Sequence, residues 1–382
     1  MSKTLFAECY LNHNLGDDLF LVALAHRYPN IKILVDANSN YESLLCTLPN
    51  VKNINTRSEK SGSVINKVLD LQSKLDVVRN ADCLVSIGGS IFIEPKADTP
   101  LRSFSSRHIK ETKDRLILSA NKHSFVIGAN FGPYTAEAFL SFYRRLFKYH
   151  CKDICFRDQA SFSLFRELTN TRVAPDLLFG TTFPTVNKNE TVLFSVVNLE
   201  YSQKYRSLNS VAPQYLSWML EAARSCYKNG LMPVISSFSS PEQDTRGCRQ
   251  FCTLLEAERI PYKRCDYYNN PDALLSAIAS SSLVIGTRFH ATVLGLAANI
   301  PVIPILYSNK TFNMLDDCGF NLKESLDLQQ LSSSTAFPSA NELIIHALNT
   351  GPFDISEQRI RSQKHFEALD LFLNAADTAI TS

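Results

Sequence analysis

The sequence has almost no excess charge of either sign. Its 39 Lys and Arg residues stand against 37 Asp and Glu residues, which leaves a formal net charge of +2. A protein that binds nucleic acid through bulk electrostatics needs a strongly basic face. We therefore expect no nucleic-acid partner, although a local basic pocket remains compatible with this balance.

The sequence also lacks cysteines and histidines at the spacing that is typical of metal sites. The ten cysteines form no CxxC pair, and the closest ones, Cys151/Cys155 and Cys248/Cys252, have helical spacing without histidines in a metal-ligand arrangement. We expect buried, reduced thiols. No DxD-like acidic pair lies in a loop after a predicted strand, so we predict no metal site and no cofactor apart from the substrates.

Long hydrophobic runs are absent too. No apolar stretch is long enough to span a bilayer, so we predict no transmembrane segment. The first residues lack the apolar core of a signal peptide and soon reach Glu8. These features predict a cytoplasmic protein, for which peripheral association with a membrane stays open.

What the sequence does contain is alternation of strands and helices around a substantial core, with 45% hydrophobic residues. The length of 382 residues favours two domains. We predict an α/β fold with two Rossmann-like domains whose mostly parallel sheets face a cleft. The predicted boundaries are 1–185 for the first domain and 190–350 for the second, followed by one helix over 355–380. A polar stretch over 94–108 interrupts the pattern before a helix over 109–120.

Ligands of open α/β sheets bind beyond the carboxyl ends of the strands, which directs attention to three loops in the first half. Asn14, Gly16 and Asp17 follow the first predicted strand, where Gly16 permits a close approach and Asp17 can cap a helix. Gly88, Gly89 and Ser90 follow a buried strand and can present backbone N–H groups to an oxygen-rich ligand. The segment 127–133, which contains Asn130, has the same character. Each loop is also compatible with an ordinary turn.

The most informative segment follows the strand over 283–285. Arg288, Phe289 and His290 open a helix there, so they lie near a helix N-terminus that favours an anion. Arg288 adds a guanidinium fork that fits a carboxylate or phosphate, and His290 can bind phosphate or act as an acid.

Two further cations lie at strand ends in the predicted fold. Arg157 follows one strand and Lys310 follows another, directly after Ser308 and Asn309. Either cation alone is compatible with a solvated or ion-paired side chain, and Asp158 is adjacent to Arg157. Together with Arg288 they predict a cationic pocket.

The order of these motifs resembles the polysaccharide pyruvyltransferase family, from about residue 8 to about residue 320. The motifs are Asn14-Leu15-Gly16-Asp17, Gly88-Gly89-Ser90, Ile127-Gly128-Ala129-Asn130-Phe131-Gly132-Pro133, Phe156-Arg157-Asp158, Ala174-Pro175-Asp176, and Arg288-Phe289-His290 with Tyr307-Ser308-Asn309-Lys310. The resemblance implies a glycosyltransferase B-like fold. It also implies transfer of pyruvate from phosphoenolpyruvate to two hydroxyls of a sugar, or of a lipid-linked oligosaccharide, as a ketal with release of phosphate.

The resemblance, together with the rule that ligands bind beyond the carboxyl ends of the strands, suggests roles for these residues. His290 is the candidate acid and Asp17 the candidate base, placed on the first domain across the cleft from the anion site. The candidate donor-binding residues are Arg288, Phe289, Arg157, Lys310 and Ser308. The candidate acceptor-binding residues are Asn14, Gly16, Gly88, Gly89, Ser90, Asn130 and His108.

Two other functions stay open at this point. A nucleotide-sugar-dependent glycosyltransferase of the B fold would share the architecture and the anion site. It would usually carry a carboxylate for the donor ribose at a late strand end, where residues 307–310 have none. A non-catalytic sugar-binding protein would release no phosphate.

Overall fold

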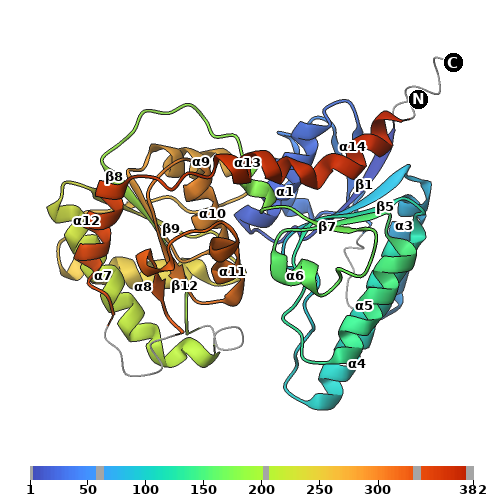
Figure 1. The fold of residues 1–382 in the computed structure, drawn as a ribbon, viewed down its shortest axis with the longest axis horizontal. Coiled ribbons are helices and arrows are strands. Elements are labelled where there is room, and N and C mark those ends of the chain that lie inside the picture. Colours follow the sequence, from blue (N-terminus) through green and yellow to red (C-terminus); the bar gives the residue numbers. More distant parts are fainter. Residues whose placement is uncertain (1–2, 57–63, 201–205, 330–336, 376–382) are drawn as a thin grey trace. The chain divides into compact units, whose positions relative to one another are not determined.

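The computed structural model describes residues 3–56, 64–200, 206–329 and 337–375. They form two compact units (Figure 1). Unit 1 comprises Met1–Leu11, Phe20–Leu177 and Gln363–Ser382, and unit 2 comprises Asn12–Leu19 and Leu178–Ser362. This division differs from the predicted boundaries at two places, because Asn12–Leu19 groups with unit 2 and the C-terminal segment groups with unit 1.

Unit 1 is built on a parallel seven-stranded sheet in the order β3-β2-β1-β4-β5-β6-β7. Three neighbouring strands, β4, β5 and β6, are buried at nearly every position, as expected for a parallel sheet covered on both faces, whereas the edge strands β3 and β7 are not. The strands are β1 (Thr4–Cys9), β2 (Lys32–Val35), β3 (Val51–Asn53), β4 (Cys83–Ile87), β5 (Ser124–Ala129), β6 (Asp153–Phe156) and β7 (Thr171–Val173).

Helices cover both faces of this sheet, with α1 and α14 on one face and α4 and α5 on the other (Figure 1). An aromatic cluster fills the space beneath α5, where Phe131, Tyr143, Phe147 and Phe165 pack ring against ring. The helices are α1 (Leu15–Arg27), α2 (Glu42–Leu45), α3 (Val64–Asn80), α4 (Pro100–Ala120), α5 (Glu137–His150), α6 (Gln159–Ser163) and α14 (Glu367–Asn374).

Unit 2 repeats this plan with a six-stranded parallel sheet in the order β10-β9-β8-β11-β12-β13. The strands are β8 (Thr191–Ser195), β9 (Met232–Ser236), β10 (Lys263–Arg264), β11 (Leu283–Gly286), β12 (Val302–Leu306) and β13 (Leu326–Asp327). The β8, β11 and β12 strands are buried at every position, so the centre of the sheet forms the core.

The helices of unit 2 also lie on both faces, and α12 packs beside α7 over the buried Trp218. α10 is buried along its whole length. The helices are α7 (Ala212–Lys228), α8 (Asp244–Ala257), α9 (Pro271–Ser280), α10 (Phe289–Ala297), α11 (Asn309–Asp317), α12 (Ala340–Thr350) and α13 (Ser356–Ser362).

Two predicted elements were wrong in extent. The polar stretch 94–108 is not a loop throughout, because α4 begins at Pro100 with the Thr99 hydroxyl accepting from the Arg102 backbone N–H. The single helix predicted over 355–380 is broken within the described residues into α13, a 3-10 turn over Gln363–Phe366, and α14. The break buries His365, whose Nε2 binds the Pro175 carbonyl at 2.8 Å.

Candidate active site

Each sheet has a topological switch point, where successive connections leave in opposite directions. In unit 2 the chain runs from β8 through β9 to β10, then returns to β11 on the other side of β8. The switch point is therefore between β8 and β11, and ligands of such sheets bind at its carboxyl end. Arg288 lies there, two residues after β11, and its backbone N–H donates to the Ser195 hydroxyl at the end of β8.

Two helices begin side by side at this edge, and neither has a side-chain cap. Arg288 occupies the N-cap position of α10 and Ser308 that of α11, each without a side-chain hydrogen bond to its helix. Lys310 connects the two helix starts, since its Nζ lies 5.4 Å from the centroid of the Phe289 ring. A helix N-terminus carries partial positive charge, so this edge of unit 2 favours an anion.

A second feature of this edge is the hydroxyl group of Ser308. Its Oγ is buried and has no hydrogen-bond partner among the described residues. The Thr311 Oγ1, one turn further along α11, is in the same condition. Buried hydroxyls in folded proteins are nearly always paired, so these two indicate a ligand or water at the start of α11.

The Arg288 guanidinium is already engaged by two carboxylates. Its Nε donates to both carboxylate oxygens of Asp244 at 3.1 and 2.9 Å, and its Nη1 contacts Glu242. Asp244 is completely buried and also accepts the backbone N–H groups of Phe238 and Ser239. Burial raises the pKa of Asp244, and the Arg288 charge opposes that rise. The structure therefore holds Arg288 rigidly, with Asp244 on one side of its fork and Glu242 on the other.

His290 lies against the start of α1. A Cβ added to Gly16 would lie 1.6 Å from the His290 Nδ1 atom, so only glycine fits at this position. Glycine at residue 16 thus has a packing reason, namely that the imidazole occupies the space of a side chain. Gly16 N–H also donates to the Asn14 side chain at 3.1 Å.

The whole segment Asn12–Leu19 is fixed to unit 2. Leu15 N–H donates to the Phe238 carbonyl at 3.0 Å, Asn14 forms a bridge with Ser239, and the buried Asp18 accepts from the Tyr267 hydroxyl at 2.6 Å. The structure therefore groups Asp17 with unit 2, and not with the first domain as predicted. Asp17 is half-buried in the first turn of α1, next to the glycine that contacts His290.

A second polar cluster lies in unit 1, beyond the ends of β4, β5 and β6. Arg157 donates to Asp176 at 2.9 Å and to the Asn130 side chain at 2.6 Å. Ser90 donates to the same Asn130 oxygen at 3.1 Å, and the Arg157 guanidinium lies against Gly89, where a Cβ would be 2.6 Å from Nη1. The structure thus brings together four predicted residues, and Arg157 pairs with Asp176 rather than with its neighbour Asp158.

Asp158 has a different task, because its carboxylate caps α6 by accepting from Ser161 N–H at 2.7 Å. His108 lies on α4, stacks on Phe104 at 4.0 Å between ring centroids, and contacts Glu111. Its role in acceptor binding stays a prediction.

Sequence reasoning missed the acidic residues that hold the cations. Asp244 and Glu242 follow β9 on a turn whose Gln243 has a φ of +59°, and no sequence signal marked them. Asp18 was not singled out, because its neighbour Asp17 was the candidate base. The structure distinguishes the two, since Asp18 is completely buried. Asp176 belonged to a quoted motif, and its pairing with Arg157 needed the fold.

Other kinds of site find no support in the described part of the chain. Among residues 3–56, 64–200, 206–329 and 337–375, no group of three or more His, Cys, Asp or Glu side chains is placed to hold a metal ion. None of the ten cysteines forms a disulfide bond, and burial raises the pKa of the Cys83 and Cys226 thiols to about 12.

No described helix combines the length and the apolar character needed to cross a membrane.

Comparison with known proteins gives a family and a fold. The family model for polysaccharide pyruvyl transferase matches residues 14–309. A search of curated proteins finds no match. Among solved structures, the Anabaena protein Alr3699/HepE in complex with UDP and glucose is 12% identical, with a TM-score of 0.51 and 100% of both chains covered.

Two further solved structures have the same architecture. UDP-GlcNAc 2-epimerase from Neisseria meningitidis, bound to UDP-GlcNAc, has a TM-score of 0.54 and 12% identity, covering 96% of this chain and 99% of that one. A Listeria monocytogenes protein described as a candidate UDP-N-acetylglucosamine 2-epimerase has a TM-score of 0.56 and 10% identity, covering 100% and 97%. These similarities confirm the predicted glycosyltransferase B-like fold.

Proposed function

Because the chain belongs to the polysaccharide pyruvyl transferase family, we propose that it transfers pyruvate from phosphoenolpyruvate to two hydroxyls of one sugar residue. The product is a ketal, and phosphate is released. The acceptor in this proposal is a sugar residue of a glycan or of a lipid-linked oligosaccharide.

One observation carries the choice of donor. The helices α10 and α11 begin at neighbouring strand ends without side-chain caps, and Lys310 in the first turn of α11 extends over the Phe289 ring at the start of α10. Phosphoenolpyruvate presents a carboxylate and a phosphate, which require several N–H groups and a cation. The unpartnered Ser308 hydroxyl adds a hydrogen-bond donor at the same place.

The proposed chemistry uses groups at this edge of unit 2. Protonated His290 donates its proton to the methylene carbon of phosphoenolpyruvate, which makes the neighbouring carbon electrophilic. The first sugar hydroxyl attacks that carbon, and the carbon–oxygen bond to phosphate then breaks. The second hydroxyl closes the ketal. Asp17 accepts a proton from an attacking hydroxyl, while the second hydroxyl proton leaves with the phosphate.

The ion pairs of Arg288 give it a defined role in this proposal. Asp244 is buried and fixes Nε and Nη2, whereas Glu242 contacts Nη1 and is 23% exposed in its side chain. We propose that a donor anion takes the place of Glu242 at Nη1. Replacing Glu242 by Gln removes the competing charge, so donor affinity should rise.

The test is steady-state kinetics with phosphoenolpyruvate as the varied substrate. We expect Arg288→Lys to weaken donor binding by about ten- to hundredfold, since one charge-assisted contact is worth about 1.5–3 kcal/mol. His290→Ala should lower turnover more than donor affinity if the imidazole is the acid. His346→Ala is the matched control, because this exposed histidine on α12 lies far from the switch point in sequence. Unchanged kinetics in both site variants would contradict the proposed donor site.

A further inference from the structure

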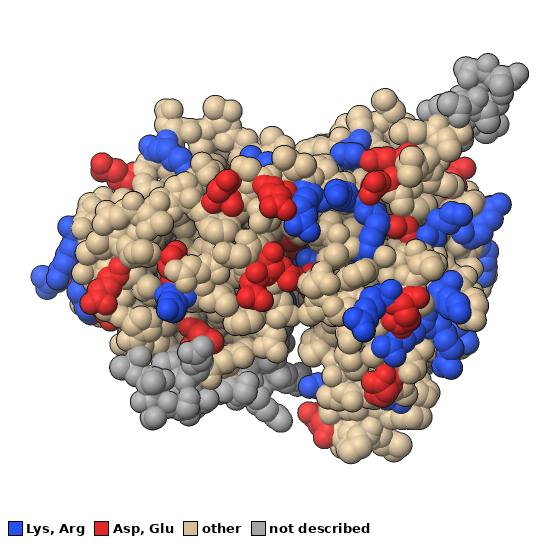
Figure 2. Space-filling model, viewed as in Figure 1, with Lys and Arg blue, Asp and Glu red and all other residues tan. Residues whose placement is uncertain are grey.

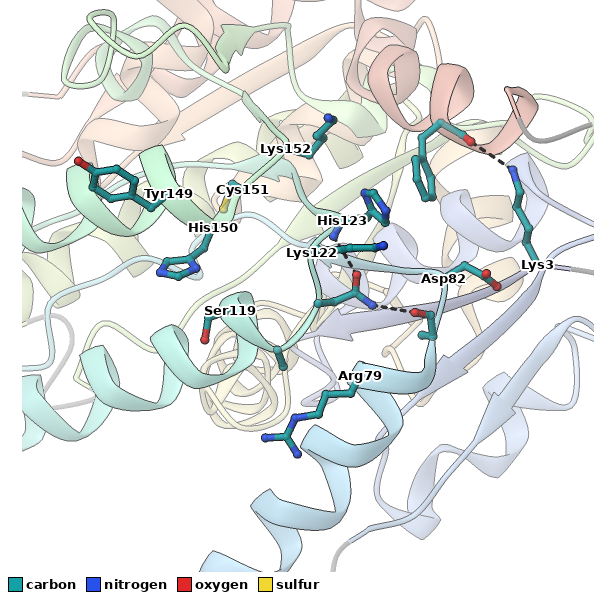
Figure 3. Close-up of a pocket in the computed structure, with 14 residues that line it drawn as sticks. Lys3, Arg79, Asp82, Ser119, Lys122, His123, Tyr149, His150, Cys151 and Lys152 are labelled. Atoms are coloured by element: carbon teal, nitrogen blue, oxygen red, sulfur yellow. Dashed lines mark hydrogen bonds between the residues drawn. The ribbon is translucent and has the colours of Figure 1, made fainter. Parts of the chain in front are cut away.

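A basic cavity lies at the amino edge of the unit 1 sheet, the edge opposite to the cluster that contains Arg157. It has a volume of about 980 Å³. Its lining includes residues that directly precede four strands, namely Lys3 before β1, Asp82 before β4, His123 before β5 and Lys152 before β6 (Figure 3). Because these strands are neighbours in the sheet, their first residues form a row along one edge.

The row is held by backbone hydrogen bonds and not by flexible loops. Asp82 N–H donates to the Thr4 carbonyl at 2.9 Å, Leu84 N–H to the His123 carbonyl at 3.0 Å, and Lys152 N–H to the Ser124 carbonyl at 2.7 Å. The sheet therefore fixes where each side chain starts, and the floor of the cavity is rigid.

The basic side chains that line this cavity outnumber its carboxylates. Arg79 is paired with Asp76 at 2.7 Å, and Lys3 donates to the carbonyls of Phe372 and Leu373 in α14. Lys122 and Lys152 are exposed, and no described carboxylate lies within ion-pair distance of either. On the face of the molecule in Figure 2, Lys and Arg side chains gather over the part of unit 1 that carries α5, with Asp and Glu side chains among them.

The helices that end here do not explain these lysines. The C-termini of α3, α4 and α5 adjoin the cavity, and helix C-termini attract cations. Their carbonyls have other partners, however. Asn121 Nδ2 donates to the Val78 and Ala81 carbonyls at 2.9 and 2.8 Å, and Asn170 Nδ2 donates to those of Phe147 and Cys151 at 3.0 and 2.8 Å.

The pKa of His123 is affected by the charges of the two lysines. Its ring stacks on Phe372 at 4.6 Å between centroids, and its Nδ1 is buried without a hydrogen-bond partner among the described residues. Burial, followed by the charges of Lys122 and Lys152, lowers the pKa of His123. Lys122 and Lys152 thus give the cavity a positive potential, which is suited to an anionic oxygen ligand.

We propose that this cavity is a second binding site, for a multiply charged phosphate ligand held by Lys122 and Lys152. Ammonium groups bind phosphate as point charges and tolerate varied geometry. The volume is at the upper end of the range for small-ligand sites. A soluble diphosphate and the head group of an anionic phospholipid share this chemistry, and the two sources are distinguished by the experiment.

The experiment compares the full chain with Lys122→Gln/Lys152→Gln. The matched control is Lys52→Gln/Lys113→Gln, which removes two exposed lysines of unit 1 outside the cavity. Binding of inorganic pyrophosphate is measured by titration calorimetry at constant ionic strength. Sedimentation with vesicles of phosphatidylcholine, with and without phosphatidylglycerol, tests the lipid source.

We expect the wild type and the control to bind pyrophosphate, or the anionic vesicles, and the cavity variant to bind about tenfold more weakly. Binding of pyrophosphate alone identifies a soluble ligand, and binding of anionic vesicles alone identifies a head group. Equal binding by the wild type and the cavity variant would overturn the proposal, as would the absence of binding to both probes.

Discussion

At the scale of single residues, the contact between Gly16 and His290 ties the start of α1 to the candidate acid. A methyl group at residue 16 would overlap the imidazole, with only 1.6 Å to Nδ1. We expect Gly16→Ala to displace His290 and to reduce turnover as severely as His290→Ala. The kinetic assay described above measures this effect.

A double-variant cycle shows whether the collision is the cause. If the added methyl group in Gly16→Ala destabilises the protein by pushing the imidazole, removing that imidazole relieves the strain. Gly16→Ala/His290→Ala should then be more stable than the sum of the single changes predicts, by about 0.5–3 kcal/mol in urea denaturation. Additive free energies of unfolding would show that Gly16 is needed for another reason.

Residue types at strand ends were readable from the sequence, but their partners were not. The glycine, arginine and histidine motifs each follow a strand, and the strand pattern was strong enough to place them. Asp244 and Asp176 bind Arg288 and Arg157 across 44 and 19 positions of sequence. Such pairings are set by which strands become neighbours, and a single sequence does not contain that information.

At the scale of elements, the N-terminus of α11 is the part of the site that stability measurements can test. Ser308 occupies an N-cap position but makes no cap hydrogen bond, so Ser308→Ala should leave the free energy of unfolding nearly unchanged. Ser339 caps α12 by accepting from Glu342 N–H, so Ser339→Ala should cost about 1 kcal/mol.

The two variants should rank in the reverse order for donor affinity. Ser308→Ala removes a hydrogen bond that we assign to the donor and should weaken donor binding. Ser339→Ala removes only the cap of α12 and should leave donor binding unchanged. Urea denaturation and the Michaelis constant for phosphoenolpyruvate are the two measurements. A loss of stability in Ser308→Ala without any change in donor affinity would contradict this assignment.

The 3-10 turn between α13 and α14 predicts a pH dependence of stability. Burial lowers the pKa of His365 from 6.5 to about 3, while the hydrogen bond to the Pro175 carbonyl opposes that shift. The folded protein therefore keeps His365 neutral at pH values where the unfolded chain binds a proton. Its contribution to stability is complete above about pH 6.5 and falls by about 1.4 kcal/mol per pH unit below it, towards pH 3.

Urea denaturation at several pH values measures this contribution. We expect His365→Gln to lose less stability between pH 6.5 and pH 4 than the wild type, because glutamine binds no proton. His108→Gln, at an exposed position, should follow the wild type. Parallel curves for the wild type and His365→Gln would contradict the role of His365.

Elements were predictable where their hydrophobic pattern was long, and less so where polar residues form them. The strand predicted over 283–285 is present as β11, and residues 88–90 follow the buried strand β4 as predicted. The short strands β7, β10 and β13 have only two or three residues and were missed, because so short a segment has no period of its own. The first turns of α4 were missed because their side chains are mostly polar and exposed.

At the scale of the whole molecule, the family and the fold agree with the sequence prediction, while the division of the chain does not follow sequence order. A segment from the first half, Asn12–Leu19, belongs to unit 2, and the C-terminal residues belong to unit 1. Both of these segments contact residues of the sequence motifs. Gly16 contacts His290, and His365 binds the carbonyl of Pro175, which precedes Asp176. Contacts of this range lie beyond local sequence patterns.

The central claim is that phosphoenolpyruvate is the donor, and phosphate release tests it directly. Wild type and His290→Ala are incubated with phosphoenolpyruvate and a panel of galactosides, glucosides and mannosides, and free phosphate is measured. We expect phosphate release that depends on one acceptor class and is strongly reduced in His290→Ala. No release with any acceptor, together with thermal stabilisation by a nucleotide sugar and not by phosphoenolpyruvate, would contradict the claim and indicate a glycosyltransferase.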